Sequence, residues 1–202
     1  MRRVGYPGDV SELPEYEKKR DTSKSGEPSS RRRGRRRKRE HPVFVVQRHD
    51  ATNLHFDFRL EIDGALVSWA VPKGPSVDPR DKRLAVHVED HPLDYADFEG
   101  RIEDGYGEGT VVVWDTGSYD NLTEQDGEPV EPSTALRDGH LKVELHGQKL
   151  TGAFALTHTK LGGDDQNWML VKVDDEGADR RRRPTSTQNE SVLSGRTNED
   201  FD

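Results

Sequence analysis

The sequence predicts a mainly β fold, a small closed antiparallel β-barrel of about eight strands with one or two short surface helices. Three observations support this class. Short apolar or alternating runs recur between residues 43 and 173, turn-forming residues separate most of them, and neither internal repeats nor βαβ spacing is present. Closure removes the exposed edges that such a sheet would otherwise leave, so a barrel is favoured over an open sheet.

Eight runs have the character of strands. They cover residues 43–47, 54–61, 65–71, 83–89, 110–115, 141–146, 152–158 and 168–173. Asp63-Gly64 indicates a two-residue hairpin between the second and third runs. A turn is also predicted before the seventh run, at residues 147–149. Helical signals are confined to residues 12–20 and 133–137, so helices contribute little to the fold.

Polar residues are concentrated at the two ends of the chain. The hydrophobic fraction is 30% and the mean hydropathy is −1.01, which are low values for a compact domain of 202 residues. We therefore expect a barrel domain at residues 41–175, a polar segment before it at 1–40, and a disordered C-terminal tail at 176–202. Nothing in the strand pattern demands a partner chain, so we expect a monomer.

The formal net charge of −8 alone would argue against a nucleic-acid-binding protein. Its distribution reverses that inference, because eight basic residues lie between positions 31 and 39 and leave the rest of the chain at about −16. Such an arm can follow a phosphate backbone, and a solvated charge run is the alternative interpretation. The candidate nucleic-acid-binding residues are Arg31, Arg32, Arg33, Arg35, Arg36, Arg37, Lys38 and Arg39.

The chain contains no cysteine, which excludes disulfides, thiolate metal sites and cysteine nucleophiles. Any metal must therefore be held by nitrogen and oxygen atoms. No apolar run approaches the length of a membrane span, and the N-terminus lacks the apolar core of a signal peptide. We expect a soluble protein in the cytoplasm.

The run at residues 54–61 gathers chemically active side chains on one face. Strict alternation places His55, Asp57 and Arg59 together, with apolar side chains on the opposite face. The first two can bind a metal, and the guanidinium can bind a phosphate. The alternative is that Arg59 only forms a salt bridge with Asp57 or Glu61.

The fourth run repeats this pattern. Alternation predicts Arg83, His87 and Glu89 on one face, with His91 in the same parity. If the two faces line one pocket, the chain can offer three ligands to a divalent ion and keep one imidazole spare. Nitrogen and oxygen ligands of this kind suit manganese, zinc, iron or cobalt better than calcium. The candidate ligand set is His49, His55, Asp57 and His91.

Longer motifs around these residues resemble the 3′-phosphoesterase domain of bacterial DNA ligase D, over roughly residues 18–175. The motifs are FVVQRH at 44–49, LHFDFRL at 54–60, SWAVPKGP at 68–75, DKRLA at 81–85, VEDHPLDY at 88–95, DFEG at 97–100, GTVVVW at 109–114 and NWMLVK at 167–172. The resemblance implies a small β-barrel that uses manganese, or cobalt or another divalent transition ion in its place, to heal 3′ ends. It would act first as a phosphodiesterase that removes a 3′-terminal ribonucleoside, then as a phosphomonoesterase that leaves a 3′-OH.

The resemblance also implies roles for individual residues. His49, Asp57 and His91 would bind the metal, while His55 and Arg59 would hold the scissile phosphate. The other residues implied to be catalytic are Lys73, Arg83 and Tyr95, and those implied to support the site are Gln47, Glu89, Arg20, Asp21 and Glu27. The last three would place residues 18–28 of the N-terminal segment at the active site.

The implied substrate is a DNA or RNA-terminated DNA primer-template. No ligase or polymerase module lies within the 202 residues, so we expect a stand-alone form that works with a separately encoded ligase and polymerase. Two alternatives stand beside this interpretation. A non-haem iron oxygenase could use His55, Asp57 and His91, although it would leave His49 unexplained. The chain could also be a nucleic-acid end-binding module without catalytic activity.

Overall fold

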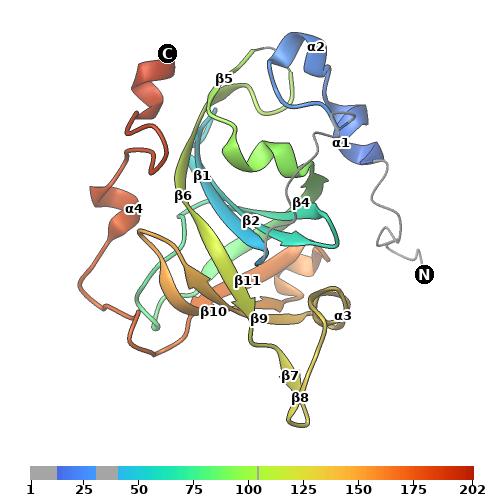
Figure 1. Cartoon of the computed structure of the whole chain (residues 1–202), viewed down its shortest axis with the longest axis vertical. Coiled ribbons are helices and arrows are strands. Elements are labelled where there is room, and N and C mark those ends of the chain that lie inside the picture. The colour runs from blue at the N-terminus through green and yellow to red at the C-terminus, as the bar shows by residue number, and fades with distance from the viewer. Residues whose placement is uncertain (1–12, 31–40, 104) are drawn as a thin grey trace.

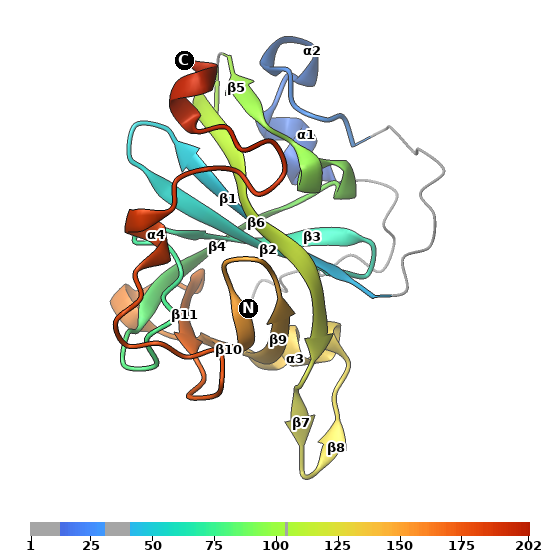
Figure 2. The ribbon, with the colours of Figure 1, turned by 60° about the vertical axis from the view of Figure 1, so that its left-hand side comes forward.

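The computed structural model describes residues 13–30, 41–103 and 105–202, and the Arg-rich arm lies outside these residues. Eight strands close into an antiparallel barrel, in the order β1-β2-β3-β4-β11-β10-β9-β6, with β6 pairing back onto β1 (Figures 1 and 2). Their bounds are β1 Val43–Asp50, β2 His55–Ile62, β3 Ala65–Val71, β4 Arg83–His91, β6 Gly109–Asn121, β9 His140–His146, β10 Thr151–His158 and β11 Asn167–Lys172. The predicted fold class is confirmed.

Shorter elements decorate the barrel. They are the strands β5 Gly100–Ile102, β7 Glu124–Gln125 and β8 Glu128–Pro129, the α-helices α1 Pro14–Lys19, α2 Thr22–Ser25, α3 Pro132–Asp138 and α4 Pro184–Thr187, and the 3₁₀ helices η1 Leu93–Asp97, η2 Leu161–Gly163 and η3 Asn198–Phe201. The two predicted helices correspond to α1 and α3. None of the helices within the described residues is long and apolar enough to cross a membrane.

The barrel interior is apolar, and the polar face of β2 lies on the outside. Phe56 and Phe58 are buried in a core that also holds Trp69 and Trp114, so the alternate side chains of β2 must point away from it. A second, smaller core covers the outer face beneath α1 and η1, where Tyr16 packs with other buried side chains. The sequence suggested that the polar faces of two strands could line one pocket. The structure places that site between the barrel wall and the elements that cover it.

An irregularity in the pairing of β3 with β4 decides which side chains of β4 reach the outer face. Trp69 pairs with His87 and Ser68 pairs with Val88, but the next registered pair is Leu66 with His91. The register shift inserts an extra residue into β4, as a β-bulge does. His87 therefore lies on the same face as the core residue Trp69, 5.5 Å from it between ring centroids. The expected common face for His87 and His91 was wrong, because simple alternation takes no account of the bulge.

The C-terminal segment at residues 176–202 packs along the barrel, in contrast to the disordered tail that its composition suggested. The amide of Val192 donates to the carbonyl of Val113 at 3.0 Å, and the side-chain amide of Asn198 donates to the carbonyl of Thr110 at 2.7 Å. Figure 2 shows this segment, in red, passing from α4 to the neighbourhood of β5. Hydrophobic patterning missed it because backbone and amide hydrogen bonds, rather than an apolar stripe, attach it to the barrel.

Candidate active site

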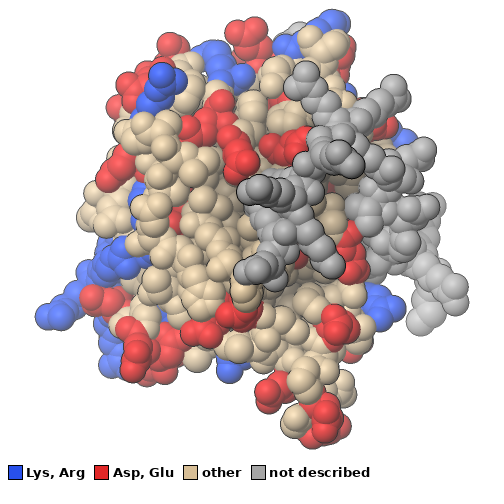
Figure 3. Space-filling view, in the orientation of Figure 1, with Lys and Arg blue, Asp and Glu red and all other residues tan. Residues whose placement is uncertain are grey.

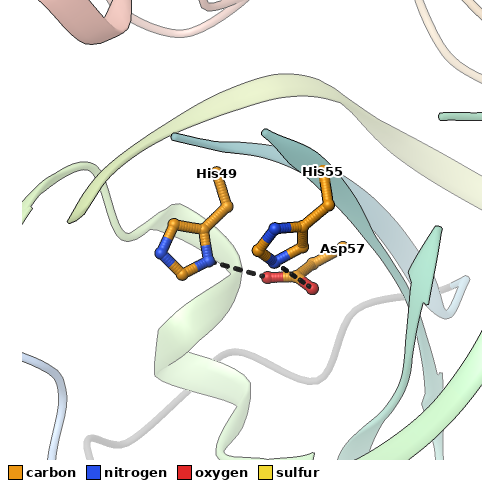
Figure 4. Close-up of side chains that lie close together, drawn as sticks. All are labelled: His49, His55 and Asp57. Atoms are coloured by element: carbon orange, nitrogen blue, oxygen red, sulfur yellow. Dashed lines mark ion pairs between the residues drawn. The ribbon is translucent and has the colours of Figure 1, made fainter. Parts of the chain in front are cut away.

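Two histidines and an aspartate converge on the outer face where β1 ends and β2 begins (Figure 4). His49 and His55 are paired directly across the two strands, and Asp57 follows two residues along on the same face. Nδ1 of His49 lies 3.6 Å from Oδ2 of Asp57, and Nε2 of His55 lies 3.6 Å from Oδ1 of the same carboxylate. One ligand atom from each residue lies within 4.8 Å of the other two.

Backbone carbonyls set the orientation of both imidazoles. Nε2 of His49 lies 2.8 Å from the carbonyl oxygen of Gly107, and Nδ1 of His55 lies 2.9 Å from that of Asn53. A carbonyl oxygen can only accept, so these two ring nitrogens carry the hydrogens when the rings are neutral. The unprotonated nitrogens then face Asp57. Two imidazole nitrogens and a carboxylate, each imidazole anchored by a carbonyl, form a donor set that fits a divalent transition ion.

Arg59 lies directly behind this group and is fixed on three sides. Its Nη2 donates to Oδ2 of Asp57 at 3.0 Å, its Nε donates to Oε1 of Gln47 at 2.8 Å, and its Nη1 donates to Oγ of Ser68 at 2.8 Å. Burial acts to raise the pKa of Asp57, but Arg59 and the two histidines outweigh it and hold that pKa well below its usual range. Asp57 is therefore an anion throughout the neutral pH range, as a metal ligand requires.

His91 lies beside this group and faces a different partner. Its Nδ1 donates to the backbone carbonyl of Glu89 at 2.9 Å, and its Nε2 lies 3.3 Å from Nη2 of Arg20, which donates to it. Burial, with Arg59 and Arg20 adding to it, lowers the pKa of His91 well below its usual value. The sequence grouped His91 with the metal ligands and His55 with the phosphate. In the structure it is His55 that lies with His49 and Asp57, and His91 lies outside that group.

The N-terminal segment reaches the site through Arg20. This side chain donates to Glu89 at 2.5 Å and to Glu27 at 2.9 Å, and the hydroxyl of Tyr95 donates to the same oxygen of Glu27 at 3.0 Å. Burial acts to raise the pKa of Glu89, but Lys19 and Arg20 together lower it below its usual value. Four residues that the resemblance assigned to the site, from distant parts of the sequence, thus form one buried network.

Three other expected site residues lie apart from this network. Asp21 caps α2, where its carboxylate accepts from the amide of Ser23, and Lys73 is exposed in the turn after β3. Arg83 forms an ion pair with Asp81 at 2.8 Å, at the end of β4 opposite His91. The geometry brings none of the three into the His49–His55–Asp57 group.

Sequence reasoning missed Ser68 and Tyr106. The hairpin signal at residues 63–64 contained the information for Ser68, because a two-residue turn places it directly opposite Arg59, as observed. Tyr106 precedes the glycine that anchors His49, and the residue is 54% exposed. Nζ of Lys19 lies 4.9 Å from the centre of that ring, and Cζ of Arg20 lies 5.5 Å from it. Together they line a hollow beside α2.

These features define the general class of the protein. It is a small β-barrel domain whose outer wall carries a candidate metal centre beside a buried guanidinium. The chain belongs to the DNA ligase D 3′-phosphoesterase domain family, whose model matches residues 47–158. That range contains the whole His49–His55–Asp57 group and the residues of β4 and η1 that adjoin it.

Curated relatives agree with this assignment. The chain is 49% identical over 189 residues to the multifunctional non-homologous end joining protein LigD of Pseudomonas aeruginosa, covering 90% of this chain and 22% of that protein. It is 44% identical over 191 residues to the multifunctional non-homologous end joining DNA repair protein LigD of Mycobacterium tuberculosis, covering 86% and 22%. It is also 41% identical over 169 residues to LigD of Mycolicibacterium smegmatis, covering 83% and 21%. The chain thus spans about a fifth of the length of these relatives.

Proposed function

We propose that this chain is a divalent-metal-dependent phosphoesterase that heals 3′ ends of nucleic acid strands during end-joining DNA repair. It removes a 3′-terminal ribonucleoside from a primer end and then the 3′-phosphate, which leaves a 3′-OH for ligation. The observation that carries the proposal is the convergence of His49 and His55 on the Asp57 carboxylate, with the Arg59 guanidinium directly behind it. Membership of the family and the names of the relatives support it.

The metal would be held by His49, His55 and Asp57. Manganese suits this nitrogen and oxygen donor set, and cobalt is the natural substitute. Bound there, the ion would supply Lewis acidity toward a non-bridging oxygen of the phosphate. The chain prepares the set before any ion arrives, since the carbonyls of Gly107 and Asn53 already hold the hydrogens of both imidazoles away from Asp57.

Arg59 is suited to hold the scissile phosphate. A guanidinium has five N–H donors, and the three bonds to Gln47, Ser68 and Asp57 occupy one on each nitrogen. One N–H on each terminal nitrogen is left for phosphate oxygens, in the forked geometry that a lysine cannot offer. Because the three bonds fix the guanidinium in advance, no reorganisation is needed as charge develops on those oxygens.

His91 and Arg20 complete the phosphate side of the site. His91 is held neutral, with Nε2 as an acceptor, while Arg20 donates to it. An arriving phosphate anion would draw Arg20 away from Nε2 and favour the protonated imidazole, so Nε2 would take a proton from water and then donate it to the leaving oxygen. Tyr95 has a positioning role. Burial raises the pKa of its hydroxyl well above the usual value, so it stays protonated and donates to Glu27, while its ring lies 5.0 Å from Cζ of Arg59.

The hollow at Tyr106 is suited to the nucleoside next to that phosphate. An exposed aromatic ring can stack a base of any sequence, and Lys19 and Arg20 beside it attract the backbone. This arrangement would let the site accept strand ends of differing sequence. Replacing Tyr106 by alanine should weaken binding of the strand end and leave the affinity for the metal unchanged.

The test uses primer-templates that end in a 3′-phosphate, in a single 3′-ribonucleotide or in an all-deoxy 3′-OH, incubated with manganese. We expect phosphate release from the first, shortening of the second, and no attack on the third. Asp57→Asn should lose metal affinity and turnover together, whereas Arg59→Lys should keep the metal and lose about 10²–10³-fold in kcat. Arg137→Lys, on the exposed face of α3, is the matched control. Absence of turnover with every divalent ion would leave end binding as the better account.

A further inference from the structure

A second group of metal-competent side chains lies on the outer wall of the barrel, on β6 and β9. It consists of Asp120, Glu144 and His146, whose ligand atoms all lie within 4.8 Å of one another, with His41 alongside. None of the four belongs to the candidate active site. We propose that this group binds a divalent transition ion of the zinc type, independently of the phosphoesterase reaction.

The sheet itself brings the ligands together. In the antiparallel pairing of β6 with β9, Asp120 lies directly opposite Glu144, and His146 lies two residues further along β9 on the same face. The alternate residues Val143 and Leu145 are buried in the barrel core, so Glu144 and His146 point outward. Three ligands on two hydrogen-bonded strands have little backbone freedom to lose when an ion binds.

The distances bring a fourth ligand within reach. Nε2 of His146 lies 2.8 Å from Oδ2 of Asp120, and Nδ1 of His41 lies 3.6 Å from its other oxygen. His41 is held there because the carbonyl of the next residue, Pro42, accepts from the amide of Tyr119 at 3.0 Å. Two imidazoles and two carboxylates can fill the four positions that zinc prefers, and rotation of these exposed side chains can close the remaining separations.

The charge arrangement also favours a cation. Two carboxylates directly opposite each other on neighbouring strands repel, and Asp120 and Glu144 occupy such a pair. The adjoining β7–β8 hairpin adds exposed glutamates, and Figure 3 shows acidic side chains gathered over it at the bottom of the view. A divalent ion between the strands would bring two positive charges to relieve this repulsion, whereas the imidazole of His146 can bring at most one. The side chains of Asp120 and His146 are 50% and 46% exposed, so binding should be weaker than at a buried structural zinc site.

The experiment measures zinc binding to the full chain, without a histidine tag, in a variant that carries His49→Ala and Asp57→Asn. These two changes remove the proposed catalytic ligands, so the result is independent of the proposed function. Titration calorimetry should then find one zinc ion per chain, and adding His146→Ala should weaken its binding at least tenfold. His140→Ala is the matched control, because His140 is an exposed histidine on the same strand that contacts only Thr157 among the contacts described.

A change in melting temperature gives a second measurement. Zinc should raise the melting temperature of the parent variant but not of the His146→Ala variant, and with a chelator the two should melt alike. Asp120→Asn, which preserves the shape of the side chain, should reproduce the loss of zinc affinity if His146→Ala folds poorly. Failure of the parent variant to bind zinc, or equal weakening by His140→Ala and His146→Ala, would overturn the proposal and reduce the group to a surface ion pair.

Discussion

Replacing Arg20 by alanine tests whether one buried guanidinium docks residues 13–30 onto the active site. The side chain of Arg20 is 7% exposed, and those of its partners Glu89 and Glu27 are 2% and 1% exposed. The replacement leaves Glu89 with the half-exposed Lys19 as its cation, and leaves Glu27 with the hydroxyl of Tyr95. The buried carboxylates of Glu89 and Glu27 would then lack the guanidinium that pairs with both of them.

Removal of one partner from a buried ion pair typically costs ~3–5 kcal/mol. The remaining contacts of Glu89 and Glu27 place the expected cost at the lower end, about 3 kcal/mol. We expect this loss to detach residues 13–30 locally rather than to unfold the whole domain. The helix α1 has six residues and α2 has four, so both can detach while the barrel stays folded. A loss of about 3 kcal/mol raises the population of the detached segment on the order of 100-fold.

Amide hydrogen exchange measures this population directly. The amides of Glu17 and Ser25 are hydrogen-bonded within the segment, and their exchange should accelerate on the order of 100-fold in Arg20→Ala, with little change in the barrel strands. The kcat/KM for a 3′-phosphate end should fall in the same variant. Lys24→Ala is the control, since Lys24 pairs with Asp21 in the same segment but its side chain is 72% exposed. Unchanged exchange in Arg20→Ala, or equal acceleration in both variants, would refute the docking argument.

Three further changes have expected outcomes. Burial, reinforced by Glu15 and Glu89, raises the pKa of Asp90 to about 6, from about 3.9 in the unfolded chain. The folded state therefore binds this proton more tightly than the unfolded state, and the stability that this contributes is fully present below about pH 4 and is lost as the pH rises through about 6. Asp90→Asn should therefore flatten the fall in melting temperature over that interval, and an unchanged pH profile would contradict this. Asn198→Ala should accelerate amide exchange in residues 188–198, because the carbonyls of Arg48 and Thr110 lose their donor. Asp115→Ala should lower stability by about 3 kcal/mol in chemical denaturation, because three backbone amides of the turn before β10 lose their acceptor.

Periodicity predicted the barrel strands because each carries an apolar residue at every second position toward the core. It predicted β6 only as far as Asp115, since the strand continues as a ribbon that pairs first with β1 and then with β9. The short pairs β7 and β8 consist of exposed residues and have no apolar signature. The packing of the C-terminal segment was not predicted for a related reason. The buried side-chain amide of Asn198 holds this segment to the barrel, and hydropathy counts asparagine as polar.

The shared face of His55, Asp57 and Arg59 was predictable because alternation in a regular strand fixes it. Which histidine, His55 or His91, lies with His49 and Asp57 was not predictable from alternation. Parity along β4 changes at the bulge opposite β3, and the carbonyls that orient His49 and His55 come from loops whose conformation no periodicity determines. Placing Arg20 beside His91 required a contact across 71 residues of sequence, which alternation cannot supply.

Because apolar side chains fill the barrel interior, the candidate site lies on the outer wall, where the N-terminal segment covers it. The wall itself carries the carboxylates of Asp57 and Glu89 and the guanidinium of Arg59, and residues 13–30 add two cations and one carboxylate. The formal charges then balance, because three buried carboxylates, Asp57, Glu27 and Glu89, face the buried guanidiniums of Arg20 and Arg59 and the half-exposed ammonium of Lys19. A neutral network has little net attraction for a phosphate dianion, so tight binding of a 3′-phosphate end should require charge added at His49, His55 and Asp57. Arg20 would then be shared between the substrate and the docking contact, and strand-end binding and segment docking should change together.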